Sequence, residues 1–294
     1  MKNWTTLACA FATCLSIAGC STIPADTSLT RPGPSSGKDR AQWTMPLDRY
    51  RIESNLDYVT DVLVEECMHE NGFAYQRPLV DATATSETIS RSGRNLFNVE
   101  IAARWGYSGA PDPNRDTIRA AESASTSWPQ EKSDAYWVCL SKAANMSADA
   151  VRINNTIAAL GASPWSEAQK DPRVQTAAAD WFQCMQPLGF SDLPESPHHD
   201  AGGTPTPAMA ASFGEIADGK SNVQTARQEA EEIRLAIFDA NCRESSNYAQ
   251  ALYDAEWEGQ TRVVEENQET LDALLAEKQA YERQVQDVLD KAGQ

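Results

Sequence analysis

The residues best suited to covalent chemistry are four widely spaced cysteines. They are even in number, and none belongs to a Cys-x-x-Cys pair of the kind that forms a zinc knuckle. In an exported chain, thiols seldom stay reduced, so four such cysteines predict two disulfide bonds rather than a metal site. The four residues are Cys67, Cys139, Cys184 and Cys242.

Two of these cysteines begin the same short pattern, Cys-Met-x-x-x-Gly-Phe, at residues 67–73 and 184–190. Each copy is typical of the last turn of a helix, followed by a glycine in the left-handed conformation and a phenylalanine that folds back onto the helix. If each copy opens a module that the next cysteine closes, Cys67 pairs with Cys139 and Cys184 pairs with Cys242. The other two connectivities of four cysteines stay open at this point.

A literal match to the phosphate-binding loop Gly-x-x-x-x-Gly-Lys-Ser lies at residues 214–221. A true loop of this kind follows a buried strand and opens the helix of a βαβ unit. The preceding residues 205–212 are rich in proline and alanine and do not have the pattern of a strand. The context therefore predicts a linker that runs into a helix, without a bound nucleotide or other cofactor.

Histidines and carboxylates offer little catalytic chemistry. His198, His199 and Asp200 could hold a metal ion, but they lie in a proline-rich stretch and no fourth ligand accompanies them. The acidic pairs at residues 65–66 and 231–232 are adjacent in sequence, so their side chains point to different parts of a helix surface. Such pairs are typical of a solvated helix surface and make poor partners for acid–base catalysis. We therefore predict no catalytic residue and no metal site.

The first 20 residues predict export and lipid attachment. Lys2 precedes an apolar run over residues 7–17, which is too short to span a hydrocarbon core of about 30 Å. Residues 1–19 have the pattern of a cleaved signal peptide. The tail Ile-Ala-Gly-Cys at residues 17–20 resembles the bacterial lipobox, with isoleucine where leucine is usual. Cys20 would then carry acyl chains, palmitate among them, that anchor the protein in the membrane. The alternative is an ordinary signal peptide with an incidental cysteine.

The rest of the chain divides into four parts by composition. Residues 20–43 comprise the lipidated cysteine and a flexible tether rich in proline, glycine and serine. Residues 44–190 predict a helical domain that contains the first cysteine module. Residues 191–220 predict a surface loop rich in proline and glycine, and residues 221–294 predict acidic C-terminal helices packed on the body.

Apolar residues recur at spacings of three and four along most of the domain, which predicts amphipathic helices. Gly161 and Pro164 are among the residues expected to end them. A short extended piece within residues 96–107 is the exception to the helical pattern. The predicted helical segments are 48–70, 131–145, 149–160, 172–185, 221–246 and 248–291.

The C-terminal segment carries a heptad pattern that polar residues interrupt. Leu271 and Leu274 lie on its two apolar seams, but Lys278 and Asn267 occupy seam positions as well. These polar residues disfavour a long free-standing coiled coil. We predict a mainly α, disulfide-stapled domain with a long C-terminal helix or helical hairpin that packs back on it; oligomerisation through this helix is the alternative.

The charge of the chain constrains its partners. Of 294 residues, 25 are Lys or Arg and 42 are Asp or Glu, for a net charge of −17. Nucleic acid is an unfavourable partner because binding it requires a field of Lys and Arg that displaces counterions from phosphates. The expected partners are the membrane, through the acyl chains on Cys20, and an envelope protein or wall polymer.

Together these motifs resemble a group of uncharacterised actinobacterial surface lipoproteins. The resemblance covers most of residues 45–294 and rests on the lipobox, the two Cys-Met-x-x-x-Gly-Phe turns and further short motifs. It implies a lipid-anchored surface protein with helical cysteine modules, and it implies no activity. The further motifs are Leu96-Phe97-Asn98-Val99, Trp105-Gly106-Tyr107, Trp137-x-Cys139, Trp181-x-x-Cys184 and Ala240-Asn241-Cys242-Arg243.

The sequence thus predicts a non-catalytic protein on the extracytoplasmic face of the cell membrane that acts as an interaction or structural module. The alternative is a cell-wall or glycan-processing enzyme whose site the sequence does not reveal. A deep pocket with converging carboxylates would favour the enzyme. An exposed aromatic surface around Trp105, Trp128 or Trp165 would favour binding. A two-lobed α/β solute-binding protein is disfavoured, because repeated strand–helix units are not found.

Overall fold

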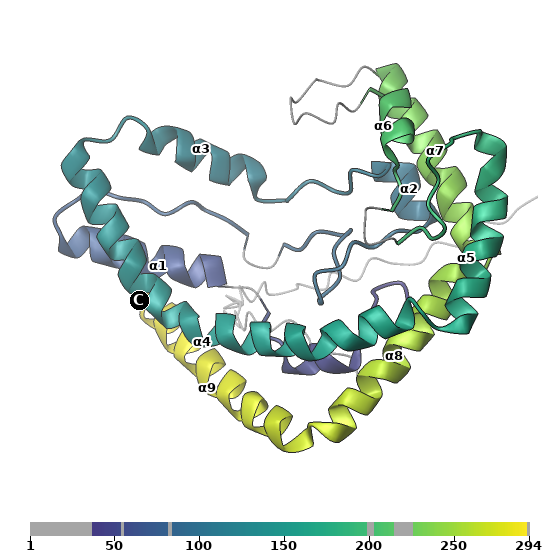
Figure 1. The fold of residues 1–294 in the computed structure, drawn as a ribbon. Helices are drawn as coiled ribbons and strands as arrows, with labels where there is room; N and C mark the ends of the chain where they lie inside the picture. The colour runs from purple at the N-terminus through teal and green to yellow at the C-terminus, as the bar shows by residue number, and fades with distance from the viewer. Residues whose placement is uncertain (1–36, 54–55, 82–83, 199–202, 215–225, 293–294) are drawn as a thin grey trace, which may run out of the picture. The chain divides into compact units, whose positions relative to one another are not determined.

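A computed structural model of the chain describes residues 37–53, 56–81, 84–198, 203–214 and 226–292. These residues are mainly helical, and the described ranges contain no strand, only an isolated β-bridge between Ile89 and Asn95 (Figure 1). The predicted mainly α fold, with two disulfides and a long C-terminal helix, is confirmed. The elements are η1 (Pro46–Tyr50), α1 (Leu56–Glu70), α2 (Val99–Trp105), α3 (Arg115–Ser125), α4 (Gln130–Ala168), α5 (Pro172–Met185), η2 (Gln186–Leu188), α6 (Pro207–Ser212), α7 (Ala226–Ser245), α8 (Tyr248–Glu266) and α9 (Gln268–Ala292).

Several sequence predictions lie outside the described residues. They are the signal peptide, the lipobox with Cys20, His199 and Asp200 of the candidate metal cluster, and all of the phosphate-loop match except Gly214. Across the described ranges, no helix is long and apolar enough to cross a membrane.

The first cysteine module joins α1 to α4 through the Cys67–Cys139 disulfide. The helix cap predicted for the repeat is present, since Gly72 has a φ of 81° and the Phe73 N–H donates to the carbonyl of Met68 at 3.0 Å. This is the hydrogen bond that a left-handed glycine cap makes at the end of a helix. Met68 and Cys139 are buried together, so the disulfide lies inside a small apolar cluster.

Helix α4 is continuous over 39 residues, whereas the sequence predicted two helices that end before Gly161. Its C-terminal part is covered by α8. A Cβ atom on Gly259 of α8 would lie only 3.1 Å from the Cβ of Pro164, so glycine at position 259 makes room for the buried proline. Packing against a neighbouring helix therefore outweighs the local preference of Gly161 and Pro164 to end the helix.

Two further predictions were wrong because helix caps were overlooked. Residues 96–107 contain α2 rather than an extended piece, and the side chain of Asn98 caps it by accepting from the Ile101 N–H at 2.9 Å. Within the predicted loop 191–220, α6 begins at Pro207 and is capped by the Thr206 hydroxyl. Asn or Thr before a first turn satisfies N–H groups that have no partner within the helix.

The C-terminal helices pack back on the body. The predicted segment 248–291 breaks once, at Asn267, into α8 and α9. Helix α9 contacts α1, α4 and η1, where Leu271 and Leu274 are buried against residues of α4. Lys278, the polar residue on the predicted seam, donates to the carbonyl of Arg49 at 3.0 Å. A partner within the chain thus accommodates this charge in the helix interface.

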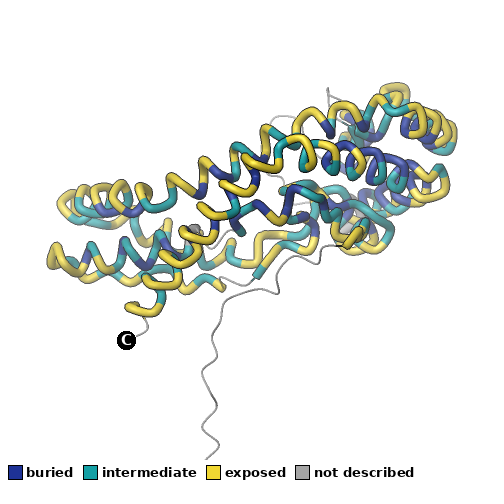
Figure 2. Tube along the Cα trace, turned by 90° about the horizontal axis from the view of Figure 1, so that it is seen from below, coloured by how far each residue is buried: buried dark blue, intermediate teal, exposed yellow. Residues whose placement is uncertain are grey.

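Burial follows the helices. Figure 2 shows buried and exposed positions alternating along them, as expected for amphipathic helices packed on one side. The buried apolar residues form several separate clusters, each at a contact between two or three elements. Helix α3 is different, because none of its residues is buried.

The end of the predicted tether packs on the end of α7 and on α8. Lys38 forms an ion pair with Asp254 at 2.8 Å, and Arg40 forms a bidentate pair with Glu244. Trp43 makes an edge-to-face contact with Tyr253. The folded part of the chain therefore includes residues 37–43, which the sequence assigned to the tether.

Candidate functional site

Two adjoining cavities, of about 400 and 240 Å³, lie between the segment before α2, the C-terminal part of α4, the segment after η2 and the end of α7. The larger extends toward Gly106–Ala110 and Thr204, and the smaller extends toward Trp43 and Tyr248. We refer to both together as the Arg243 pocket. Five residues line both cavities: Asn95, Phe97, Trp165, His198 and Arg243.

A carboxylate of α7 fixes the turn that forms one wall of the larger cavity. Glu232 accepts from the N–H of Tyr107 at 2.9 Å and from both the N–H and the hydroxyl of Ser108. Gly106 precedes them with a φ of 60°, and a Cβ atom there would lie 2.6 Å from the Glu232 carboxylate. Only glycine fits this close approach at positive φ. The turn therefore places Tyr107 over α7.

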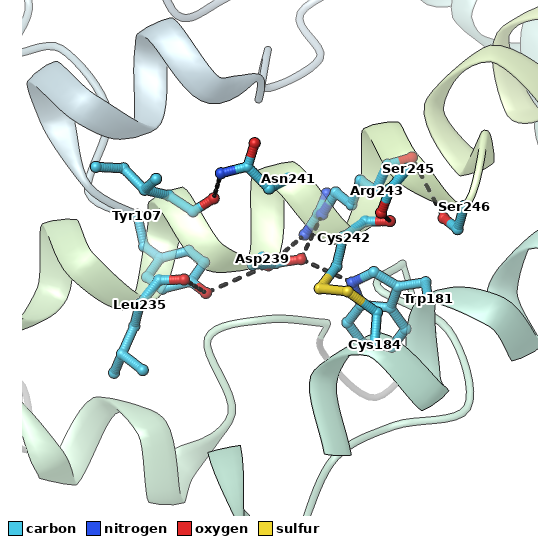
Figure 3. The surroundings of a disulfide bond; sticks show 11 residues. Tyr107, Trp181, Cys184, Leu235, Asp239, Asn241, Cys242, Arg243, Ser245 and Ser246 are labelled. Atoms are coloured by element: carbon cyan, nitrogen blue, oxygen red, sulfur yellow. Dashed lines mark hydrogen bonds and ion pairs between the residues drawn. A yellow bond between two sulfur atoms is a disulfide. The ribbon is translucent and has the colours of Figure 1, made fainter. Parts of the chain in front are cut away.

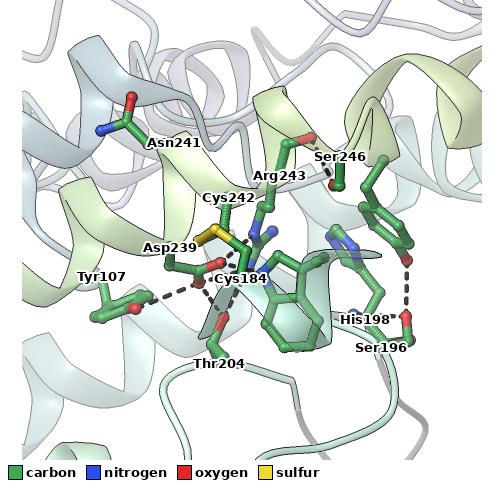
Figure 4. A network of polar contacts seen from close by, with 12 residues as sticks. Tyr107, Cys184, Ser196, His198, Thr204, Asp239, Asn241, Cys242, Arg243 and Ser246 are labelled. Carbon is green, nitrogen blue, oxygen red and sulfur yellow. Dashed lines mark hydrogen bonds and ion pairs between the residues drawn. A yellow bond between two sulfur atoms is a disulfide. The ribbon is translucent and has the colours of Figure 1, made fainter. Parts of the chain in front are cut away.

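Asp239 is the centre of a buried polar network beside the pocket (Figure 4). Its carboxylate accepts from Trp181 Nε1 at 2.8 Å and from Arg243 Nε and Nη2 at 2.9 and 3.1 Å. The hydroxyls of Thr204 and Tyr107 donate to it as well. Burial works against its charge, but Arg243 and these hydrogen bonds hold the pKa of Asp239 below its usual value. The carboxylate is therefore ionised, and its acceptor sites are occupied.

The second disulfide positions this network (Figure 3). Cys184 on α5 is joined to Cys242 on α7. One turn before Cys184 lies Trp181, and next to Cys242 lies Arg243, so the bridge fastens the two helices where their polar side chains meet. The covalent link therefore keeps Trp181 within hydrogen-bonding distance of Asp239.

A second buried ion pair adjoins the smaller cavity. Glu256 of α8 is fully buried and pairs with Arg94. It also accepts from Trp43 Nε1 at 2.9 Å and from Gln260 Nε2 at 3.1 Å. The guanidinium of Arg94 lies 3.6 Å from the centre of the Trp165 ring, close enough for a cation–π contact. Asp239 and Glu256 are thus each paired with an arginine that also lines the pocket.

His198 lies between aromatic rings at the junction of the two cavities. Its ring stacks on Tyr248 with centroids 5.7 Å apart and meets Trp165 edge-on at the same distance. Burial, together with the nearby charges of Arg243 and Arg94, lowers the pKa of His198 to about 3, while the charge of Asp239 opposes this shift. The imidazole is therefore neutral at pH 7.

Acid should destabilise the protein through His198. The folded imidazole stays neutral down to a pKa of about 3, whereas in the unfolded chain it binds a proton below about pH 6.5. The unfolded state then binds more protons, so stability falls as pH falls. Between pH 6.5 and 4.5 we expect a loss of about 2 kcal/mol in the free energy of unfolding. Urea titrations across this range measure it.

The matching variant is His198→Gln, which should lose this pH dependence. His69→Gln replaces the same residue type outside the pocket and should retain it. Identical slopes in His198→Gln and the unmodified protein would contradict the assignment.

The candidate metal cluster gains no further support from the described part of the chain. His198 is the one member of the predicted cluster that lies within it. No group of three or more His, Cys, Asp or Glu side chains with metal-binding geometry is found in the described ranges.

The three tryptophans singled out from the sequence lie in different places. Trp165 lines the pocket. Trp105 is half-buried and donates to Glu87 at 2.6 Å. Trp128 belongs to an aromatic cluster with Tyr75 and Tyr136 near the first disulfide, outside the pocket.

Sequence reasoning missed the charged residues of the pocket. Asp239 and Arg243 are four residues apart on α7, a spacing that places them on one helix face beside Cys242. That spacing was a readable signal. Arg94 and Glu256 are 162 residues apart, and no local pattern connects them. No protein-family model matches this chain, and neither does any curated protein or solved structure.

Proposed function

We propose that this chain is a lipid-anchored protein on the extracytoplasmic face of the cell membrane, and that its helical domain binds a small ligand in the Arg243 pocket without transforming it. The observation that carries the binding role is the state of the two carboxylates that pair with the pocket arginines. Asp239 and Glu256 are each held in an ion pair and accept further hydrogen bonds. A carboxylate occupied in this way is a poor general base or nucleophile.

The size and lining of the pocket also support a binding role. Ligand sites of small molecules usually have volumes of a few hundred Å³, with apolar walls and a few convergent polar groups. The larger cavity has a volume of about 400 Å³ and combines Phe97 and Ile101 with Ser108 and Thr204.

Its position relative to the proposed anchor adds a reason. Trp43 lines the smaller cavity and donates to Glu256, so the pocket adjoins the point where the tether enters the domain.

The anchor is tested by Cys20→Ala. Because Cys20 is the only cysteine placed directly after the apolar run and the small residues of a lipobox, its loss should release the protein from membranes or block its processing. The measurements are membrane fractionation and the intact mass of the mature chain. Cys14→Ala, within the apolar run, is the matched control and should leave the protein in the membrane fraction. A Cys20→Ala protein that keeps its membrane location and its lipid mass would contradict the proposal.

The binding role is tested by native mass spectrometry of the full chain in detergent against a library of neutral, anionic and cationic small molecules and wall fragments. A ligand that is recovered unchanged and protects Trp165 from chemical modification supports binding in the pocket. The alternative, a cell-wall or glycan-processing enzyme, predicts new products of lower mass. If the protein converts a ligand into products and Asp239→Asn abolishes this conversion, the proposed role is catalysis and not binding.

A further inference from the structure

The two arginines of the pocket keep unused hydrogen-bond donors. Each guanidinium has five N–H groups. Arg243 donates through Nε and Nη2 to Asp239 and Thr204, and its Nη1 donates to no described residue. Arg94 donates through Nη2 to Glu256, and its Nη1 donates to no described residue. Both residues line the smaller cavity, so both guanidinium groups border one space.

Other groups in this space are also without partners. The Nδ1 atom of His198 is buried and has no hydrogen-bond partner in the described part of the chain. The side chain of Asn95, which lines both cavities, makes no hydrogen bond to another described residue. The carboxylates, by contrast, are occupied: four side chains donate to Asp239, and three donate to Glu256. Asp239 and Glu256 therefore leave few free acceptor sites for the two guanidinium groups, and buried donors without acceptors are costly.

We propose that the Arg243 pocket binds a small organic monocarboxylate, with its carboxylate at Arg94 and Arg243 and its apolar body in the larger cavity. The wall there includes Ile89, Leu96 and Ile101. The inference rests on the proposed function, since it names the ligand class of the same pocket. Arginine suits this role because its planar N–H groups match a carboxylate and form charge-assisted hydrogen bonds.

The charges around the pocket favour one negative charge on the ligand over two or none. Arg94 and Arg243 are balanced by Glu256 and Asp239, so a dianion such as a phosphate monoester would bring two uncompensated charges into a protein of net charge −17. A neutral ligand would leave the guanidinium donors unsatisfied.

Three probes with the same apolar chain separate these cases: hexanoate, 1-hexanol and hexyl phosphate. Each is titrated into the full chain in detergent, with binding followed by isothermal titration calorimetry and ligand-observed NMR. We expect hexanoate to bind at least about tenfold more tightly than hexanol, the usual size of a charge-assisted hydrogen bond. Hexyl phosphate should bind more weakly than hexanoate.

Variants assign the binding to this pocket. Arg94→Gln should weaken hexanoate by about tenfold or more. Glu256→Gln removes the carboxylate that competes for Arg94 and should strengthen hexanoate binding, a change of opposite sign that general damage to the pocket would not produce. Arg152→Gln is the matched control and should leave binding unchanged. Arg152 forms a half-exposed ion pair with Glu277 of α9.

The outcomes separate the ligand class from the binding role. The monocarboxylate inference is overturned if hexanol binds as tightly as hexanoate, or if hexyl phosphate binds more tightly than hexanoate. The proposed role in binding a small ligand would survive either result. Binding of hexanoate that Arg94→Gln leaves unaffected also overturns it. If no probe binds and the library screen yields no pocket ligand, both the inference and the proposed binding role fail.

Discussion

A variant that lacks both disulfides should lose most of its stability, and loss of one bridge should lower the free energy of unfolding by about 4 kcal/mol. The bridges close segments of 72 and 58 residues, and loops of this length remove much of the entropy of the unfolded chain. Since domains are stable by about 5–15 kcal/mol in total, losing both bridges consumes most of that margin. Urea denaturation of paired Cys→Ser variants measures the effect.

The two bridges should differ in a second property. Cys184–Cys242 holds Trp181 beside Asp239, whereas Cys67–Cys139 lies in the separate cluster of α1 and α4. Loss of the first should alter ligand binding in the Arg243 pocket, and loss of the second should affect stability alone. Peptide mapping without reduction is the check on the pairing, because free thiols or a link between Cys67 and Cys184 would be incompatible with it.

Replacing Asp239 with alanine should lower the free energy of unfolding by about 3–5 kcal/mol. The change leaves Arg243, whose side chain is only 7% exposed, with a buried charge and no carboxylate. It also removes the acceptor of Trp181 Nε1 and of the hydroxyls of Thr204 and Tyr107. An unpaired buried charge costs far more than the pair itself contributes, which makes this one of the most sensitive positions in the chain.

The control for this prediction is Asp149→Ala. Asp149 also pairs with an arginine on its own helix, Arg152, but both side chains are at least half exposed. Such a pair contributes about 0–1 kcal/mol. Chemical denaturation of both variants gives the comparison. Equal, small losses at Asp149 and Asp239 would refute the central role of the buried network.

The elements that the sequence predicted well are those governed by local physics. The Cys-Met-x-x-x-Gly-Phe repeat identified the helix end at Gly72, because only a residue that tolerates a φ of 81° can close the helix in this way. The same repeat favoured the observed pairing of Cys67 with Cys139 and Cys184 with Cys242. Apolar spacing likewise located α5 and the C-terminal helices, because a stripe of apolar residues requires a partner surface. The helix predicted over residues 48–70 was correct only for its later part, since η1 (Pro46–Tyr50) is a separate turn and α1 begins at Leu56.

Local signals were misleading where another segment supplied the deciding contact. Gly161 and Pro164 lie inside a helix because α8 packs against them, and Gly259 leaves the space to do so. The start of α2 was a different case, since the Asn98 cap was present in the sequence and was overlooked.

The sequence alone predicted a helical, disulfide-stapled chain with an acidic surplus, because periodicity, cysteine spacing and charge are read directly from the residues. The location of the pocket, by contrast, depends on how distant segments pack together. Arg94 meets Glu256 across 162 residues, and Tyr107 meets Asp239 across 132. Such contacts depend on how whole helices pack, and one hydrogen bond between distant segments leaves no pattern in the sequence around either residue.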